Sequence, residues 1–379
     1  MIGDRTMAPR RAALILLSAA AVLAGCAGGT PRPTPEALPP NADLIGVRQA
    51  WQTRVGAIDF PLQVSAQANR VVVASGDGTV VTLDARNGAE IARASAREPL
   101  SAGVGSDGRI AAVVTRANQV VAFEGGRELW RHRLATQTYT APLVAGGRVF
   151  VLGADRSLVA LDGASGAQLW ALQRPAEPLV LRQAGVLVAV GNTLVAGMSG
   201  RLVGVDPDAG RILWEAPIAS PRGTNDVERL VDLVAGVSRE GSVICARAFQ
   251  TSIGCVDAGN GNSRWTRPAN AATGLAGDGA RVFGAEADGE LLAWRADSGE
   301  RAWQSDRLKW RRLTGPLVLG RSVIVGDDTG LVHMFSRENG AALNRMGTDS
   351  SGVAATPVGA GNTLVVVTRS GGIYGFVPQ

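Results

Sequence analysis

The chain has 379 residues, 46% of them hydrophobic and only 4% aromatic, with 49 glycines and a formal net charge of +5 at pH 7. This composition supplies enough apolar sequence for a large buried core. The charge is mild for the length and no run of Lys or Arg occurs, which argues against a nucleic-acid-binding protein.

The first 25 residues are predicted to be a signal peptide. A positively charged segment precedes an apolar run, residues 12–24, that is too short to span a membrane as a helix. Residues 23–26, Leu-Ala-Gly-Cys, then resemble a bacterial lipobox, which makes Cys26 the predicted lipidated N-terminus. Because Ala27 follows, and not the Asp that marks inner-membrane retention, we expect a lipid anchor in the outer membrane on its periplasmic face. An ordinary signal peptide or a short membrane anchor is the alternative.

Residues 26–43 are predicted to form an extended tether without secondary structure, because small residues alternate there with prolines. The prolines are Pro31, Pro33, Pro35, Pro39 and Pro40.

From residue 44 to residue 379, one phrase of sequence recurs. Residues 158–162 alternate as a strand does, Asp162 and Gly166 supply turn chemistry, and Trp170 lies in the next strand. The positions equivalent to Asp162 are 84, 124, 206, 257, 295, 336 and 377, so the repeats are 38 to 51 residues apart. A period near 40 built from short strands is typical of the four-stranded blades of a β-propeller.

The two ends of the chain are predicted to share one blade. Trp51 lacks the strand that should precede it, and the last copy, residues 372–376, lacks the tryptophan that should follow. Joining the two halves gives an all-β ring of eight blades without exposed sheet ends. A single β-sandwich or an open solenoid is the alternative, but a solenoid needs polar capping repeats, and neither end shows one.

The longest interval between repeats contains a polar stretch, residues 220–232. Long loops on a compact scaffold are often functional, although a family can also simply tolerate an insertion.

Two cysteines are predicted to face each other across a hairpin. Cys245 and Cys255 flank the turn 249–251 symmetrically. Opposed residues of an antiparallel pair are close, and the periplasm is oxidising, so we hypothesise a disulfide between them. Two free buried thiols are the alternative.

The sequence assembles no catalytic site. The two histidines, His132 and His333, lie in different repeats without metal-ligand spacing, and no nucleophile elbow or phosphate loop is evident. The recurrent turn Asp is expected to accept backbone N–H groups. We therefore predict no enzyme activity, no catalytic residue, no metal and no cofactor.

The phrase Leu-Val-Ala-Leu-Asp…Gly-x-x-Leu-Trp resembles the PQQ-like repeat of the quinoprotein propellers. Within that superfamily the mature chain resembles the BamB family of outer membrane assembly lipoproteins over essentially its whole length. Beyond the repeat, the resemblance is carried by the lipobox with its tether and by residues 177–182, 223–232 and 308–316. It implies a non-catalytic scaffold of the BAM machinery, which inserts β-barrel proteins into the outer membrane.

The resemblance also implies a partner and its contact residues. The family binds the periplasmic POTRA domains of BamA through two neighbouring loops. By position, the Leu-x-Leu-Arg motif of the first loop falls on Leu179, Leu181 and Arg182. The acidic pair of the second loop is half kept, with Asp232 at one position and Val234 at the other. Leu179 and Leu181 could instead be ordinary strand core.

Two other functions stay open at this point. A PQQ-dependent quinoprotein dehydrogenase would need adjacent cysteines, a calcium-binding acidic set and more tryptophans, whereas Cys245 and Cys255 are ten residues apart. A propeller that binds another periplasmic ligand, such as a cell-wall component, is the third possibility. Unfolded outer-membrane β-barrel proteins are a further expected partner, through β-augmentation at exposed blade edges.

Overall fold

The computed structural model describes residues 33–175, 179–221 and 230–379. The chain divides into two compact units, Met1–Pro35 and Glu36–Gln379, and all the strands lie in the second. Cys26 and most of the predicted loop 223–232 are outside the described residues. Within the described ranges, no helix is long and apolar enough to cross a membrane.

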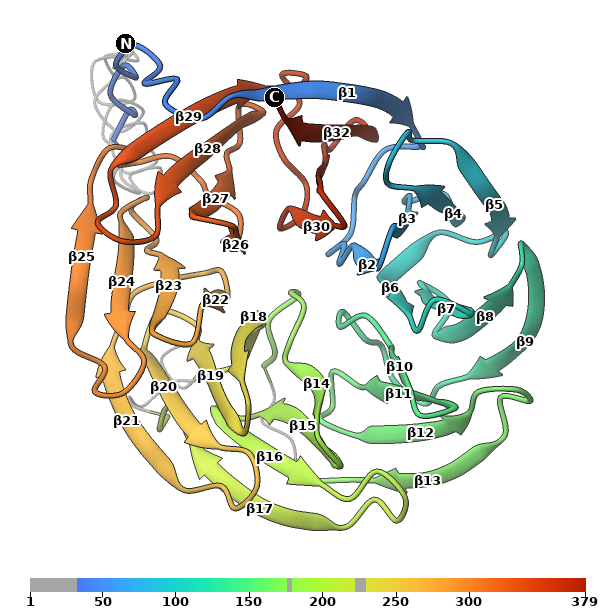
Figure 1. Cartoon of the computed structure of the whole chain (residues 1–379). Coiled ribbons are helices and arrows are strands. Elements are labelled where there is room, and N and C mark those ends of the chain that lie inside the picture. Colours follow the sequence, from blue (N-terminus) through green and yellow to red (C-terminus); the bar gives the residue numbers. More distant parts are fainter. Residues whose placement is uncertain (1–32, 176–178, 222–229) are drawn as a thin grey trace, which may run out of the picture. The chain divides into compact units, whose positions relative to one another are not determined.

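The described residues of the second unit form eight four-stranded antiparallel sheets arranged as a ring (Figure 1). We number these blades in chain order. Blades 1 to 4 are β2–β5 (Ser65–Gln67, Arg70–Ala74, Thr79–Asp84, Glu90–Ser95), β6–β9 (Leu100–Ser106, Ile110–Thr115, Gln119–Glu124, Arg127–Arg133), β10–β13 (Leu143–Ala145, Arg148–Leu152, Leu158–Asp162, Gln168–Leu172) and β14–β17 (Leu187–Val190, Thr193–Met198, Arg201–Val205, Ile212–Pro217).

Blades 5 to 7 are β18–β21 (Leu233–Glu240, Val243–Ala248, Ser252–Asp257, Ser263–Pro268), β22–β25 (Leu275–Gly277, Arg281–Ala285, Leu291–Arg295, Arg301–Ser305) and β26–β29 (Leu317–Leu319, Ser322–Gly326, Leu331–Ser336, Ala342–Gly347). Blade 8 combines β30 (Val358–Ala360), β31 (Thr363–Val367) and β32 (Gly372–Pro378) with β1 (Val47–Arg54) from the other end of the chain. The pairing of β1 with β32 runs from Val47 opposite Pro378 to Arg54 opposite Gly372, which confirms the predicted ring closure.

The core lies between the blades. Both faces of each sheet are covered by neighbours, so the inner strands are continuous apolar runs, as in β31, where every residue is buried. The outermost strands are mostly exposed, because one of their faces meets solvent, and β17 buries only alternate residues, Trp214 and Ala216. The recurrent aspartates cap turns as expected: the Asp162 carboxylate accepts the backbone N–H groups of Ala164 (3.2 Å) and Ser165 (2.8 Å).

A β-bulge at one fixed place turns the residue beside it, a tryptophan in six of the blades, toward the next blade. In blade 3, Ala160 pairs with Trp170 and Leu161 with Gln168, which leaves Leu169 unpaired. An extra residue of this kind re-aims the side chain beside it. The same bulge recurs in the other seven blades. It also explains why Leu169 and its equivalents Ile91, Leu129 and Leu213 are among the exposed large hydrophobic residues.

Six tryptophans close joints between neighbouring blades. Each ring packs against a glycine in the turn of the next blade, and each indole N–H donates to a carbonyl of that turn. The bonds run from Trp51 to Ala85 O (2.8 Å), Trp130 to Gly163 O (2.9 Å), Trp170 to Pro207 O (3.0 Å), Trp214 to Ala258 O (2.9 Å), Trp265 to Ala296 O (2.9 Å) and Trp303 to Arg337 O (3.0 Å).

Two joints depart from this pattern. Asn344 takes the tryptophan position in blade 7. Its side-chain amide donates a hydrogen bond to Ile45 O at 2.6 Å, in place of the indole N–H, at the joint where the ring closes. Ala92 takes the position in blade 1, so this joint lacks the indole that closes the others.

The end of the predicted tether packs on the ring. Leu38 contacts the cluster that contains Leu308 and Leu313, and the Arg345 guanidinium donates to Pro39 O at 3.2 Å. Asn41 donates to the Asn344 side chain at 2.7 Å. The tether, predicted to run to residue 43, therefore contacts the propeller from residue 38.

Cys245 lies directly opposite Cys255 across the β19–β20 hairpin, and the structure has a disulfide between them. We predict that the mature protein from the periplasm carries no free thiol at these positions, and that reduction lowers its free energy of unfolding by about 2–4 kcal/mol. Intact mass with and without reductant, followed by denaturation under both conditions, measures this. A Cys245→Ala/Cys255→Ala variant should not respond to reductant. Two free thiols in unreduced protein would contradict the hypothesis.

Candidate partner-binding site

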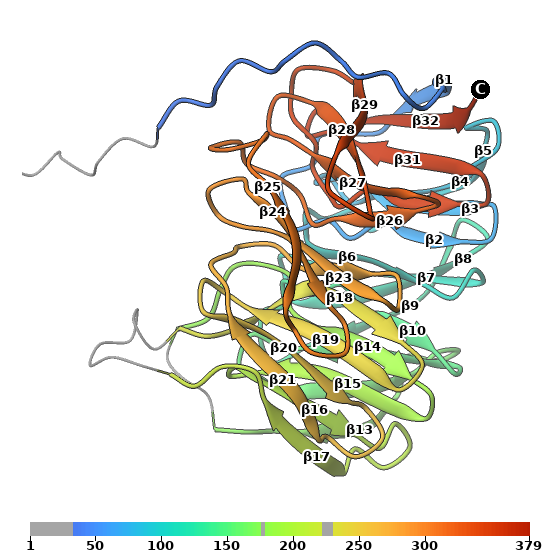
Figure 2. The ribbon, with the colours of Figure 1, turned by 60° about the vertical axis from the view of Figure 1, so that its left-hand side comes forward.

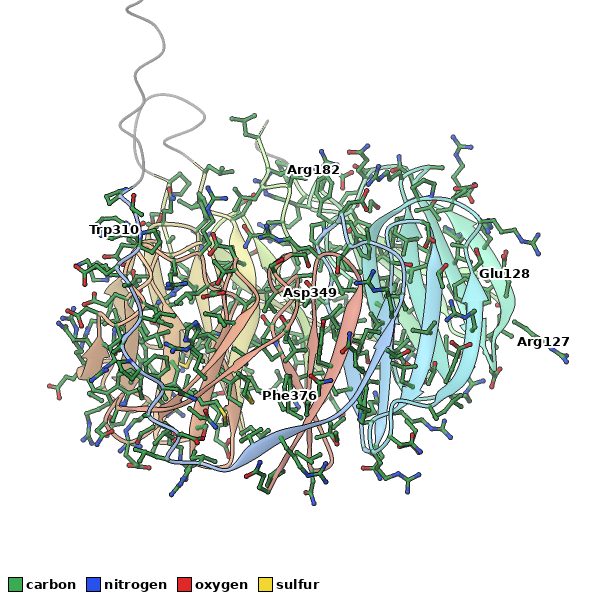
Figure 3. The ribbon with its side chains drawn as sticks, turned by 90° about the horizontal axis from the view of Figure 1, so that it is seen from above. Arg127, Glu128, Arg182, Trp310, Asp349 and Phe376 are labelled. Atoms are coloured by element: carbon green, nitrogen blue, oxygen red, sulfur yellow. A yellow bond between two sulfur atoms is a disulfide. The ribbon has the colours of Figure 1, made fainter. Side chains whose placement is uncertain are left out.

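The predicted contact residues lie at one end of the ring. Each chain segment that leads from one blade to the next crosses this end, which we call the connection face. The hairpins between first and second strands, and between third and fourth, lie at the opposite end, which we call the hairpin face (Figure 2). Figure 3 shows Arg182 and Trp310 together at the connection face, with Phe376 toward the other end.

Residues 179–182 belong to the connection between β13 and β14 and form no strand. Leu179 is 41% exposed, Arg182 is also exposed, and Leu181 is half-buried. The alternative that Leu179 and Leu181 are strand core therefore does not describe their place in the fold. Together the three side chains offer an apolar and a cationic group side by side.

Asp232 holds this segment in place from the neighbouring connection, between β17 and β18. Its Oδ2 accepts the backbone N–H of Leu181 at 2.9 Å, and its Oδ1 accepts from the Arg156 guanidinium at 3.3 Å. Arg156 also donates to Leu179 O at 3.4 Å. Both carboxylate oxygens of Asp232 therefore accept hydrogen bonds from within the protein, and Asp232 positions the segment that contains Leu181.

Arg156 is a member of the site that the sequence analysis missed. It lies in the β11–β12 turn, is 5% exposed, and has a φ of 63°. At the equivalent turn position most repeats have a glycine, such as Gly78 or Gly330, also at positive φ. A large cation in this left-handed conformation costs energy that its contacts must offset, and such strain clusters at functional sites. A comparison of the repeats at this position would have singled it out.

Tyr139 is the second missed residue. The Arg182 guanidinium lies 5.9 Å from the centre of the Tyr139 ring, a distance at which cation–π attraction operates. The Tyr139 hydroxyl donates to the Gln137 side chain at 2.7 Å. Tyr139 therefore limits the directions in which Arg182 can point, without burying it.

Val234 occupies the core. It is 1% exposed, it forms a bridge with Gly185, and the next residue, Ala235, donates its N–H to Ala184 O at 2.8 Å. A carboxylate here would be buried beside the backbone that joins the two connections. The position that the resemblance assigns to a second acid is therefore not part of the exposed surface.

The central channel supplies no set of cofactor ligands. The open space at its centre is lined by Arg312, Arg369, Gln63 and Gln183 together with small and apolar residues. Calcium requires several carboxylate or carbonyl oxygens. The described channel lining contains no carboxylate, cysteine or tryptophan, so its chemistry does not fit a calcium-bound quinone.

Two other clusters of polar side chains are structural. Burial raises the pKa of Asp327, but hydrogen bonds from His333, Thr329 and the Leu331 N–H outweigh burial and hold the pKa below its ordinary value. Burial lowers the pKa of His333. The Asp349 carboxylate accepts hydrogen bonds from the hydroxyl groups of Ser351, Thr368 and Tyr374. It thereby links the end of β31 to β32. In the described residues no group of three or more His, Cys, Asp or Glu side chains could hold a metal ion.

The eight-bladed ring, its repeat and its closure define a propeller of the PQQ-like class. Residues 179–182, held by Asp232 and Arg156, form a clamped segment on its connection face. The family described as "Outer membrane protein assembly factor BamB" matches residues 49–305. The chain is 36% identical to the outer membrane protein assembly factor BamB of Burkholderia pseudomallei, over 97% of each protein. The chain belongs to this family, as the resemblance implied.

Solved structures show the same fold. BamB from Moraxella catarrhalis superposes with a TM-score of 0.80 at 23% identity, over 87% of this chain and 99% of that one. The quinohemoprotein alcohol dehydrogenase of Comamonas testosteroni superposes with a TM-score of 0.68 at 14% identity, over 89% of this chain and 77% of that one. The propeller is thus shared between assembly factors and enzymes, and the site decides between them.

Proposed function

We propose that the protein is a non-catalytic scaffold lipoprotein of the BAM complex. Family membership makes it an outer membrane protein assembly factor. Its anchor would be lipid on Cys26, at the periplasmic face of the outer membrane. Its partner would be the POTRA domains of BamA, bound at the connection face, and it would assist the insertion of β-barrel proteins.

The observation that carries this proposal is the clamp on residues 179–182. Asp232 and Arg156 fix the backbone around Leu181 and Leu179, and Tyr139 contacts Arg182. Ordering a binding segment before the partner arrives lowers the entropic cost of association. An exposed leucine beside an exposed arginine is a combination that can supply both apolar contact and bidentate hydrogen bonds.

The path of the tether agrees with this arrangement. Leu38 packs beside Leu308 and Leu313, which lie in a connection between blades, so the described tether meets the ring at the connection face.

Co-purification with the POTRA domains tests the site. The triple variant Leu179→Ala/Leu181→Ala/Arg182→Ala is expected to lose the POTRA domains, because it removes the exposed contacts and leaves the propeller joints untouched. A matched control is Leu169→Ala/Leu213→Ala/Arg211→Ala, which removes two exposed leucines and an exposed arginine from the rim. The control should co-purify normally. Equal recovery with both triple variants would overturn the proposed site.

A further inference from the structure

The joint between blades 1 and 2 has no tryptophan, and the turn that faces the tryptophan position is short. Ala92 stands in the tryptophan position of β5, opposite Thr82. The facing turn of blade 2 is also short, since Glu124 pairs directly with Arg127 around Gly125 and Gly126. In blade 3 the equivalent turn has four residues between Asp162 and Ala167.

A small cleft lies at this joint and opens to solvent on the hairpin face. Its walls are small side chains, Ala92 and Ala94 from β5 and Ala111 from β7, and its floor is the buried pair Val80 and Phe123. Alanines line both sides of the cleft, at the joint where six other blades bury an indole ring.

The rim of the cleft is polar and cationic. Gln67, Arg70 and Arg109 line its mouth. Arg70 donates to Gly108 O at 3.3 Å, and Arg109 pairs with Glu124 at 2.9 Å, so both guanidinium groups are held near the opening. A guanidinium above a ring face attracts it electrostatically, most strongly for indole.

We propose that this cleft binds an aromatic side chain, tryptophan in particular, from an unfolded outer-membrane β-barrel protein. The chain itself shows what such a joint accepts, because six of the other joints bury an indole against the neighbouring turn. β-Barrel proteins of the outer membrane carry girdles of aromatic residues on alternating strands, so their unfolded chains present this group.

The cleft and the clamped segment lie at opposite ends of the ring. Figure 3 shows Arg127, which follows the short turn, at the rim and away from Arg182. A client bound at the hairpin face therefore leaves the connection face free for the POTRA domains. The biological identity of the ligand rests on the proposed function, whereas the cleft's selectivity for an aromatic ring does not.

Peptide binding to the folded mature protein tests the inference. The probes are a dye-labelled peptide of about ten residues with alternating apolar and polar side chains and one central tryptophan, and the same peptide with leucine there. We expect wild-type protein to bind the tryptophan peptide at least tenfold more tightly. Ala92→Trp should fill the cleft, abolish that tenfold preference and raise Tm by about 2–4 °C. Ile91→Trp, an exposed neighbour on the same strand, is the control and should bind as wild type does.

Ala111→Phe fills the cleft from the opposite wall and serves if Ala92→Trp does not fold. Equal affinity of wild type for the two peptides would overturn the inference, as would an unchanged preference when the cleft is filled. POTRA binding is measured on the same variants and should be unaffected. If wild-type protein prefers the tryptophan peptide but does not bind the POTRA domains, the proposed function is wrong and the cleft proposal stands.

Discussion

Replacing Trp214 by alanine is expected to lower the free energy of unfolding by about 3–5 kcal/mol, the usual cost of removing a large buried aromatic side chain. Trp214 is 8% exposed, and its N–H donates to Ala258 O of the next blade at 2.9 Å. Its ring packs against Gly261, where φ is 75° and an added Cβ would lie 2.8 Å from the Trp214 Cβ. The substitution therefore removes an apolar contact and a hydrogen bond between blades 4 and 5.

Equilibrium denaturation in urea measures this loss, and the neighbouring residue supplies the control. Leu213 occupies the bulge and is 51% exposed, so Leu213→Ala should change the free energy of unfolding by no more than about 0.5 kcal/mol. If Trp214→Ala cost no more than Leu213→Ala, the tryptophan joints would not be what holds the ring together.

The second large effect is expected at the joint between blades 5 and 6, where Arg247 is fully buried. Its guanidinium donates to Ala285 O at 2.8 Å, pairs with Glu286 at 2.7 Å, and lies 5.2 Å from the centre of the Trp294 ring. Burial lowers the pKa of Arg247 to about 10, which still leaves it charged at neutral pH. Arg247→Met would leave the Glu286 carboxylate with its charge uncompensated, at a cost of about 3–5 kcal/mol.

The double variant Arg247→Met/Glu286→Gln separates charge from packing. Glutamine keeps an oxygen for the Asn270 N–H, which now donates to Glu286, but carries no charge. We expect the double variant to recover most of the stability lost in Arg247→Met, measured by the same denaturation. A double variant no more stable than Arg247→Met would show that the uncompensated Glu286 charge is not the cause of the loss.

The sequence predicts the ring well because its signals are local. The period-2 strands, the turn aspartates and the missing halves at the two ends determine the blades and their closure, and the symmetric spacing around the 249–251 turn places Cys245 opposite Cys255. Each of these features depends on residues within one hairpin or on the repeat itself.

The sequence does not predict the contacts between repeats. The indole of Trp170 finds its acceptor, Pro207 O, 37 residues further on, and Arg156 meets Asp232 across 76 residues. Neither pairing follows from periodicity, since it depends on how far the bulge rotates the side chain and on how the blades are inclined. For the same reason the packing of Leu38 on the ring could not be read from a proline-rich segment.

The connection-face site was found partly from the sequence and partly from the structure. Leu179, Leu181 and Arg182 were identified by position in a family motif, whereas the clamp that orders them emerged from the fold. Asp232 illustrates the difference: the motif suggests an exposed acid, and the structure gives it the Leu181 N–H and Arg156 as partners.

Calorimetric titration of purified POTRA domains into the mature protein tests the central claim most directly. The account predicts that Leu179→Ala/Leu181→Ala/Arg182→Ala raises Kd at least 100-fold, equivalent to about 2.7 kcal/mol, because interface hot spots of this kind cost about 2 kcal/mol or more when truncated. The rim control, Leu169→Ala/Leu213→Ala/Arg211→Ala, should leave Kd within a factor of about two, well under 1 kcal/mol. A folded site variant that binds as tightly as the rim control would contradict the account.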